Sequence, residues 1–285
     1  MKSLSLVLIL IINLNYVIKA QGLMALKPNT ISTVDDNYID GVYEGKLDNR
    51  GKKDGYGIAK HNKGYVYQGN WKDDVKSGFG KAIFPNGETY EGYWENNMRN
   101  GKGTYVFASG DKYIGDFNNN KIHGEGTYYY TSGDKYIGQF EYGKISGHGV
   151  VYYKSGDRFE GSFIDGTRTG PGKYFYNDGK IYEGAFIDNQ KSGKGTLYFP
   201  DGSKYVGDFV NNKRTGWGIY TYANGDYYEG DFVNGKFEGK GTYYFVDGDK
   251  YTGGWKANQK DGDGFYERSD KEVIAKKYSM GVEIK

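Results

Sequence analysis

The chain has no cysteine, and only 4 of its 285 residues are proline. The lack of cysteine excludes a disulfide framework, thiolate catalysis and cysteine-based zinc sites. The scarcity of proline excludes collagen and proline-rich linkers. The 38 basic and 36 acidic residues leave a net charge of +2, which argues against nucleic acid as a partner. The chain is rich instead in glycine and aromatics, with 47 Gly, 31 Tyr and 15 Phe, which favours an ordered repeat over disorder.

The first 20 residues have the pattern of a secretory signal peptide. Lys2 supplies a short basic region, and residues 4–12 form a nearly unbroken aliphatic run. This run is too short for a comfortable membrane span of ~20 apolar residues. We expect cleavage after Ala20 and a secretory or extracellular location. The alternative is an uncleaved N-terminal anchor that tethers the chain to a membrane.

One pattern of 23 residues recurs along most of the chain. The copies begin with Tyr-x-Gly-x-aromatic, except that Phe replaces the first Tyr once and Leu47 replaces the second ring in the first copy. We number the positions 0 to 22 from the first ring. Glycine recurs at position 2, at positions 11 and 13, and at the turn position 20. The starts are Tyr43, Tyr67, Tyr90, Tyr113, Tyr136, Phe159, Tyr182, Tyr205, Tyr228 and Tyr251.

Each repeat has the pattern of a β-hairpin. Positions 0–5, residues 113–118 in the fourth repeat, predict a first strand, and positions 12–18, residues 125–131, predict a second. A polar loop separates the two strands, and Asn-Gly, Asp-Gly and Ser-Gly turns connect successive repeats, because glycine accepts positive φ. No part of the array has helical periodicity with caps. We therefore predict an all-β fold, an elongated twisted single-layer antiparallel sheet of tandem hairpins.

These boundaries predict four segments. They are a signal peptide (1–20), an N-terminal leader (21–42), an array of about ten repeats (43–266) and a C-terminal cap (267–285). The first repeat carries an insertion, and the last has Lys271 where the turn glycine belongs. Such departures are expected at the ends of a repeat array.

Strand alternation divides each repeat into two faces. Positions 0, 2 and 4 share a face with positions 11, 13, 15 and 17, so aromatic rings lie across bare glycine backbone, and we assign these residues to packing. The opposite face carries an apolar column at position 16, which predicts either a partner-binding stripe or rings that pack on one another along the sheet. The stripe residues are Tyr129, Tyr152, Phe175, Tyr198 and Tyr244.

Basic residues recur at positions 8 and 9 and predict one mildly basic long edge. Such an edge is typical of docking to an anionic surface or an acidic partner. It is equally the pattern of a charged rim that keeps the protein soluble. The residues are Lys76, Arg99, Lys121, Lys144, Arg168, Lys191, Lys213, Arg214, Lys236 and Lys260.

The unit Tyr-x-Gly-x-Trp/Phe, a polar segment, Gly-x-Gly-x-Tyr and then Asp/Asn-Gly-x-x-Tyr resembles the MORN repeat (membrane occupation and recognition nexus). Residues 67–89, 90–112 and 205–227 are the clearest copies, and the resemblance extends from Tyr43 to Tyr266. It implies a hairpin array that acts as a scaffold, dimerises or binds partner proteins. In some relatives it implies contact with phospholipids.

Catalytic patterns are missing from the sequence. His61, His123 and His148 have no metal-ligand spacing, and the Gly-x-Gly pairs lack the lysine and helix of a phosphate loop. We therefore predict a non-enzymatic scaffold without a cofactor, which binds a protein partner or a second copy through the stripe. One alternative is a membrane-surface module that binds anionic phospholipid through the basic edge. A second alternative is glycan binding by exposed tyrosines.

Overall fold

The structure, a computed structural model, describes Pro28, Ile31 and residues 41–284. The predicted signal peptide and most of the predicted leader lie outside these described residues. The part of the chain that is described forms strands and turns, and no helix there could cross a membrane. The strands are β1 (Gly41–Leu47), β2 (Lys53–His61), β3 (Val66–Lys72), β4 (Val75–Ile83), β5 (Thr89–Glu95), β6 (Met98–Val106), β7 (Lys112–Asn118), β8 (Lys121–Tyr129), β9 (Lys135–Glu141), β10 (Lys144–Tyr152), β11 (Arg158–Ile164), β12 (Thr167–Phe175), β13 (Ile181–Ile187), β14 (Gln190–Tyr198), β15 (Lys204–Val210), β16 (Lys213–Thr221), β17 (Tyr227–Val233), β18 (Lys236–Tyr244), β19 (Lys250–Lys256), β20 (Gln259–Glu267), β21 (Val273–Ser279) and β22 (Val282–Glu283).

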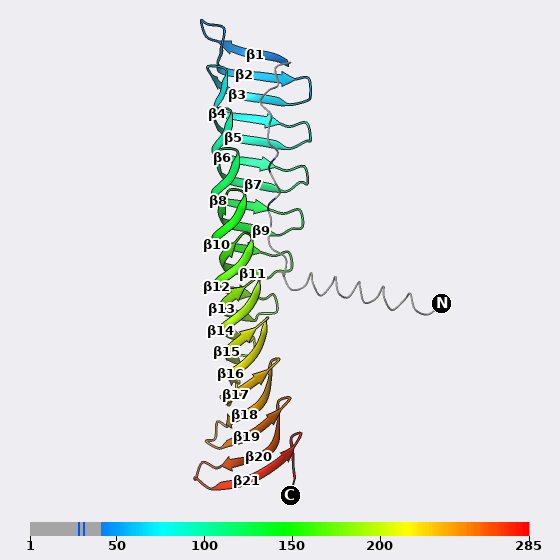
Figure 1. The fold of residues 1–285 in the computed structure, drawn as a ribbon, viewed down its shortest axis with the longest axis vertical. Coiled ribbons are helices and arrows are strands. Elements are labelled where there is room, and N and C mark those ends of the chain that lie inside the picture. Colours follow the sequence, from blue (N-terminus) through cyan, green and yellow to red (C-terminus); the bar gives the residue numbers. More distant parts are fainter. Residues whose placement is uncertain (1–27, 29–30, 32–40, 285) are drawn as a thin grey trace, which may run out of the picture. The chain divides into compact units, whose positions relative to one another are not determined.

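The 22 strands belong to one open antiparallel sheet, which confirms the predicted all-β class of tandem hairpins. The described chain divides into two compact units, residues 41–167 (the N-terminal unit) and residues 168–284 (the C-terminal unit). Within each unit, every strand lies beside the next strand in the sequence (Figure 1).

From β3 to β20, each hairpin joins a seven-residue strand to a nine-residue strand through a two-residue turn. In the third repeat the turn is Asn96-Asn97, with φ of 49° and 66°, so both residues have the left-handed backbone of a type I′ turn. Glu95 therefore pairs with Met98, and the second strand begins at position 8. The prediction that it covers positions 12–18 is wrong, because it covers positions 8–16 and the polar loop shrinks to two residues.

A β-bulge bends each hairpin near its middle. In the third repeat Trp94 pairs with Arg99 and Gly92 pairs with Gly103, so two steps along β5 face four along β6. Gly101 lies in the bulge with a φ of 78°, which glycine accepts without strain. An even number of extra residues bends the strand but leaves every side chain on its original face.

Facing glycines allow the aromatic ring at position 0 to lie flat on the backbone. A Cβ at Gly103 would lie 2.4 Å from Cε2 of Tyr90, closer than any carbon contact permits. The Tyr90 hydroxyl continues across the sheet and donates a hydrogen bond to the Tyr93 carbonyl at 2.8 Å. Glycine is therefore required at positions 2 and 13, because the aromatic ring at position 0 lies too close to the backbone there to leave room for a Cβ.

The bend folds the strand over one face of the sheet. We call this the inner face, and it carries the side chains at positions 0, 4, 9, 15 and 17. Arg99 and Tyr105 are six residues apart on β6, a separation of about 20 Å on a straight strand. Yet the Arg99 guanidinium carbon lies 5.4 Å from the Tyr105 ring centre and 5.6 Å from that of Phe84. Inner-face rings such as Tyr90 are fully buried as a result.

Hydrogen bonds join successive repeats at both ends of the strands. At the turn between repeats, Asp111 accepts from the Tyr128 hydroxyl at 3.0 Å and from the Thr131 amide at 2.7 Å. At the opposite rim, Asn97 Oδ1 accepts from the Lys76 amide at 2.7 Å. These bonds recur with the repeat, as at Asp226 and Asn212. Each repeat is thus bonded mainly to its neighbours, as the repeat pattern predicts.

The glycine column ends in the C-terminal unit at Gly264. Its partner on β21 is Lys276, where a further repeat would carry glycine. The Lys276 ammonium group pairs with Glu283 at 2.7 Å. A long charged side chain in place of glycine makes this strand unsuitable for the packing that the preceding repeats use.

Candidate binding surface

The opposite face of the sheet, the outer face, carries positions 1, 3, 12, 14, 16 and 22. The structure places the predicted stripe on it, with three of its residues exposed and two half-buried. The stripe is not continuous, because each ring alternates with a position-22 residue of the neighbouring strand. Tyr129, for example, lies between its cross-strand partners Lys112 and Lys135.

The stripe residues pack along the sheet. The Lys112 ammonium lies 4.8 Å from the ring centre of Tyr129, and Lys135 lies 4.4 Å from that of Tyr152. Tyr244 stacks on Tyr227, with ring centres 4.3 Å apart and an angle of 11° between the planes. The stack of Tyr244 on Tyr227 is a ring-on-ring contact of the kind that the packing alternative predicts, whereas Tyr129 and Tyr152 make cation–π contacts with lysines. A role of the stripe in binding stays a prediction.

The ten basic residues do not form one edge, which corrects the sequence prediction. The two-residue turn puts positions 8 and 9 inside the second strand, where consecutive side chains point to opposite faces. The four position-8 lysines are exposed at the rim of the outer face: Lys121, Lys144, Lys213 and Lys236. The six position-9 residues are buried or half-buried on the inner face: Lys76, Arg99, Arg168, Lys191, Arg214 and Lys260.

The inner-face cations lie among aromatic rings. The Lys191 ammonium is 5.3 Å from the ring centre of Tyr176, 5.4 Å from Tyr182 and 5.8 Å from Phe209, and it donates to the Tyr176 hydroxyl at 2.9 Å. Burial lowers the pKa of Lys191 to about 8. Burial likewise lowers the pKa of Lys260, whose ammonium lies among four rings. These cations are enclosed by their own chain and belong to the core.

The outer face of the N-terminal unit holds an open groove of about 700 Å³. Its floor is the glycine column with Thr104 and Thr127, because glycines leave the bent backbone bare. Phe79 and Tyr93 line it and meet edge-to-face, with ring centres 5.7 Å apart. The groove is also lined by Ile114, Ile137, Glu91, Lys102 and Glu125.

The C-terminal unit has a groove of about 530 Å³ at the equivalent place in its repeats. Its floor is again glycine with Thr242 and Thr252, whose hydroxyls are 3.0 Å apart. Trp217 and Phe265 are its aromatic residues. Its charged lining residues are Glu229, Asp231, Lys240 and Asp263.

The rings of the two grooves are exposed where most aromatics of the chain are buried. Phe79 is 49% exposed, Tyr93 53%, Trp217 50% and Phe265 58%. The sequence prediction does not include these four aromatic residues, because it assigns binding on the outer face to position 16 only. The available signal was an aromatic at position 3, 12 or 14, where most other repeats carry charged, amide or hydroxyl side chains.

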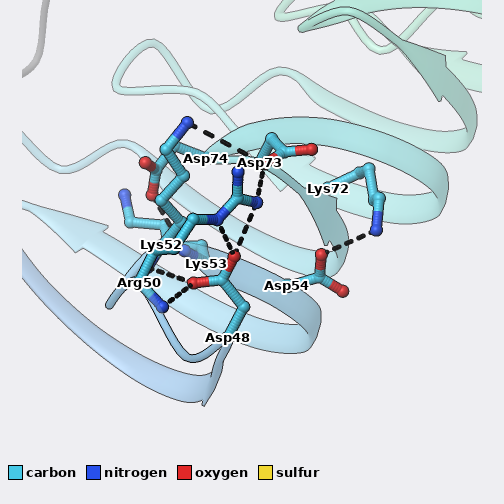
Figure 2. A network of polar contacts seen from close by, with 8 residues as sticks. All are labelled: Asp48, Arg50, Lys52, Lys53, Asp54, Lys72, Asp73 and Asp74. Carbon is cyan, nitrogen blue, oxygen red and sulfur yellow. Dashed lines mark hydrogen bonds and ion pairs between the residues drawn. The ribbon is translucent and has the colours of Figure 1, made fainter.

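The first repeat adds a polar network at its turn (Figure 2). Arg50 bridges Asp48 and Asp73, and Lys72 pairs with Asp54 at 2.9 Å. Hydrogen bonds to its carboxylate lower the pKa of Asp48. The bond from the Lys52 amide has the largest effect, and the bonds from the Arg50 side chain and amide add to it. The four carboxylates and four basic groups drawn in Figure 2 balance each other. The network therefore fastens the longer first turn to the second repeat and offers no excess charge to a ligand.

No cluster of three or more His, Asp or Glu that could hold a metal occurs in residues 41–284. His123 packs against the ring of Tyr142, with ring centres 5.0 Å apart, so its surroundings are structural. The grooves, rather than a polar cluster, are the candidate functional site.

The MORN repeat family model matches nine consecutive segments of 23 residues, from residue 67 to residue 273. The chain belongs to the MORN repeat family. The first of the ten MORN repeats predicted from the sequence, at Tyr43, precedes the matched segments, and the structure forms it as β1 and β2.

Two of the solved structures that match the chain are domains in complex with a segment of another protein. The TCP10 domain of Danio rerio CPAP, in complex with a peptide of Danio rerio STIL, is 12% identical with a TM-score of 0.41. The match covers 83% of this MORN chain and 100% of that domain. The TCP domain of Drosophila melanogaster SAS-4, in complex with a proline-rich motif of Ana2, is 17% identical with a TM-score of 0.36. That match covers 54% of this chain and 87% of the domain. No curated protein matches the chain.

Proposed function

We propose that the chain is a non-enzymatic scaffold that binds an extended protein segment on its outer face. The observation that carries the proposal is the contrast between the two faces. Inner-face rings such as Tyr90 and Tyr205 are fully buried, whereas the rings of the two grooves are about half exposed. Exposed apolar side chains gathered in a groove with a polar rim are typical of a protein-binding surface.

The shape of the grooves favours an extended chain as the ligand. Each groove crosses several strands over a floor of glycine and threonine, so it is long, open and shallow. Tyr129, at position 16, lies two residues beyond Thr127 on β8 and on the same face, so this residue of the predicted stripe borders the N-terminal groove. The stripe therefore enlarges the surface available to a partner.

The alternatives have less support. Six of the ten cations proposed for a lipid-binding edge lie on the inner face, which leaves four exposed lysines for an anionic surface. Glycan binding rests on exposed aromatic rings alone. The proposal also includes entry into the secretory pathway, which is supported by the signal-peptide pattern of residues 1–20. N-terminal sequencing of the exported chain tests this location.

Selection from a random 12-residue peptide library on purified protein tests the proposal. We expect enriched peptides whose binding falls at least about tenfold in the double variant Phe79→Ser/Tyr93→Ser, because their apolar contacts are lost. Tyr56→Ser is the matched control, since Tyr56 is also an exposed outer-face ring but does not line the groove. Circular dichroism confirms that all variants keep their strands.

A second copy of the chain is the other occupant that this surface allows. A wild-type dimer in analytical ultracentrifugation that becomes monomeric in the double variant would support a self-associating scaffold. If no peptide is enriched and the wild type is a monomer, the proposal is wrong. It is equally wrong if the double variant binds peptides or self-associates as well as the wild type.

A further inference from the structure

The two grooves differ in charge, and the difference carries an inference that rests on the proposed function. In the N-terminal groove, two of the three charged lining residues have an ion-pair partner, and Glu125 is the one without such a partner among residues 41–284. Glu91 pairs with Lys81 at 3.2 Å, and Lys102 pairs with Asp116 at 2.8 Å. Its exposed aromatic and aliphatic residues therefore dominate what it presents to a ligand.

The groove of the C-terminal unit carries carboxylates that its own chain does not neutralise. Glu229 has no ion pair with any residue from 41 to 284, and the Asp231 carboxylate accepts a hydrogen bond from the Lys240 amide at 3.2 Å. Asp263 is 3.6 Å from the Lys277 ammonium. With Asp263 paired in this way and Lys240 also lining the groove, Glu229 and Asp231 are the two lining carboxylates that have no ion pair among residues 41–284.

Aromatic rings stand beside these carboxylates. Trp217 and Asp231 are cross-strand partners on β16 and β17, so the indole and the carboxylate are neighbours on the outer face. Phe265, on β20, is the partner of Thr252 across the groove floor. A ring with a carboxylate next to it suits a cation with an apolar stem, because the ring face attracts the charge and the carboxylate pairs with it.

The same chain already uses rings to hold cations on its inner face. The Arg214 guanidinium carbon lies 5.4 Å from the ring centre of Tyr205 and 5.5 Å from that of Tyr220. Those inner-face sites are filled by residues of the chain itself. The outer-face groove has the rings and, in addition, Glu229 and Asp231, which form no ion pair with residues 41–284.

We propose that the groove lined by Trp217, Glu229, Asp231 and Phe265 recognises a lysine or arginine side chain of the extended segment that the scaffold binds. The partner is thus a basic peptide segment. In an extended peptide alternate side chains point to the same side, so basic residues at every second position would face the groove together.

Two synthetic peptides test the inference. Acetyl-(Thr-Arg)4-amide places all its arginines on one side, and acetyl-(Thr-Gln)4-amide keeps length and shape but removes the charge. We expect the arginine peptide to bind at least about tenfold more tightly, with affinity falling as ionic strength rises. Its binding should change the emission of Trp217, the one tryptophan that is largely exposed.

The double variant Glu229→Gln/Asp231→Asn should lose at least about tenfold in affinity for the arginine peptide. Asp188→Asn is the control, because it removes the same kind of charge from an exposed turn of the C-terminal unit outside the groove. The inference is overturned if the two peptides bind equally, if the arginine peptide fails to bind, or if the double variant binds it like the wild type. The scaffold function would survive any of these results, provided that library peptides still depend on Phe79 and Tyr93.

Discussion

At the scale of single residues, position 9 shows how the core of this sheet accommodates charge. The inner face takes Lys or Arg at six of these positions, and takes Ile122, Ile145 and Phe237 at others. The cations are tolerated because aromatic rings surround them, as they surround Lys191. The position therefore requires a side chain that fills space among rings, and charge is optional there.

The buried ammonium of Lys191 gives a prediction about pH. Its pKa is lowered to about 8, so between pH 8 and its ordinary pKa of 10.5 the unfolded chain binds a proton that the folded chain has released. The contribution of Lys191 to stability should therefore rise with pH in this window, by roughly 2 kcal/mol between pH 7.5 and pH 10. The buried tyrosines oppose this rise as the pH approaches 10, because burial raises the pKa of residues such as Tyr182. The Lys191 contribution is therefore the difference between the wild type and a variant that lacks this ammonium group.

Urea unfolding at pH 7.5 and pH 10 measures this effect. Lys191→Met is the comparison, since an apolar side chain at position 9 is native to other repeats, and it should remove this part of the pH dependence. An identical change of stability with pH in wild type and variant would show that Lys191 does not titrate in the core.

At the scale of the hairpin, the turn at positions 6 and 7 sets the register of everything after it. The sequence predicted two strands per repeat and the alternation of faces, because glycine spacing and period-2 patterning are local properties. It did not predict where the second strand begins. Asn119-Asn120 and its equivalents are a type I′ signal, but the sequence prediction includes them in a longer polar loop. That error moved Arg99 and its equivalents from the core to an exposed edge.

The bulge could not be predicted from the pattern either. Gly101 and its equivalents indicated a special backbone position, yet the count of residues on the two strands depends on how both strands pair. The bend that follows decides which rings meet, so the contact between Arg99 and Phe84 was not visible in the sequence.

The turn offers a matched pair of substitutions. Asn119 and Asn120 both have positive φ, of 47° and 68°, and glycine suits both positions. Only Asn120 also accepts a hydrogen bond through Oδ1 from the neighbouring repeat, from the Arg99 amide at 2.9 Å. Asn120→Gly should therefore lower the free energy of unfolding by about 1 kcal/mol, and Asn119→Gly by much less.

Hydrogen exchange at the Arg99 amide measures directly whether its hydrogen bond to Asn120 Oδ1 forms. Exchange should be faster in Asn120→Gly and unchanged in Asn119→Gly. Equal effects of the two substitutions on stability and on exchange would mean that the side-chain bond between repeats contributes nothing.

At the scale of the whole molecule, repetition separates a constant face from a variable one. The inner face repeats the same rings and glycines, which is why the sequence alone identified the family and the fold. The outer face changes from repeat to repeat at positions 3, 12 and 14, so its grooves differ in chemistry between the two units. The binding residues escaped prediction because no period marks them.

Acrylamide quenching of tryptophan fluorescence tests most directly whether the inner face is closed and the outer face open. Trp71, Trp94 and Trp255 are 6%, 3% and 7% exposed on the inner face, whereas Trp217 is 50% exposed on the outer face. We predict that Trp217→Phe removes most of the quenchable emission and that Trp94→Phe leaves it. If Trp217→Phe leaves quenching unchanged while the other three tryptophans are readily quenched, the assignment of the two faces is contradicted.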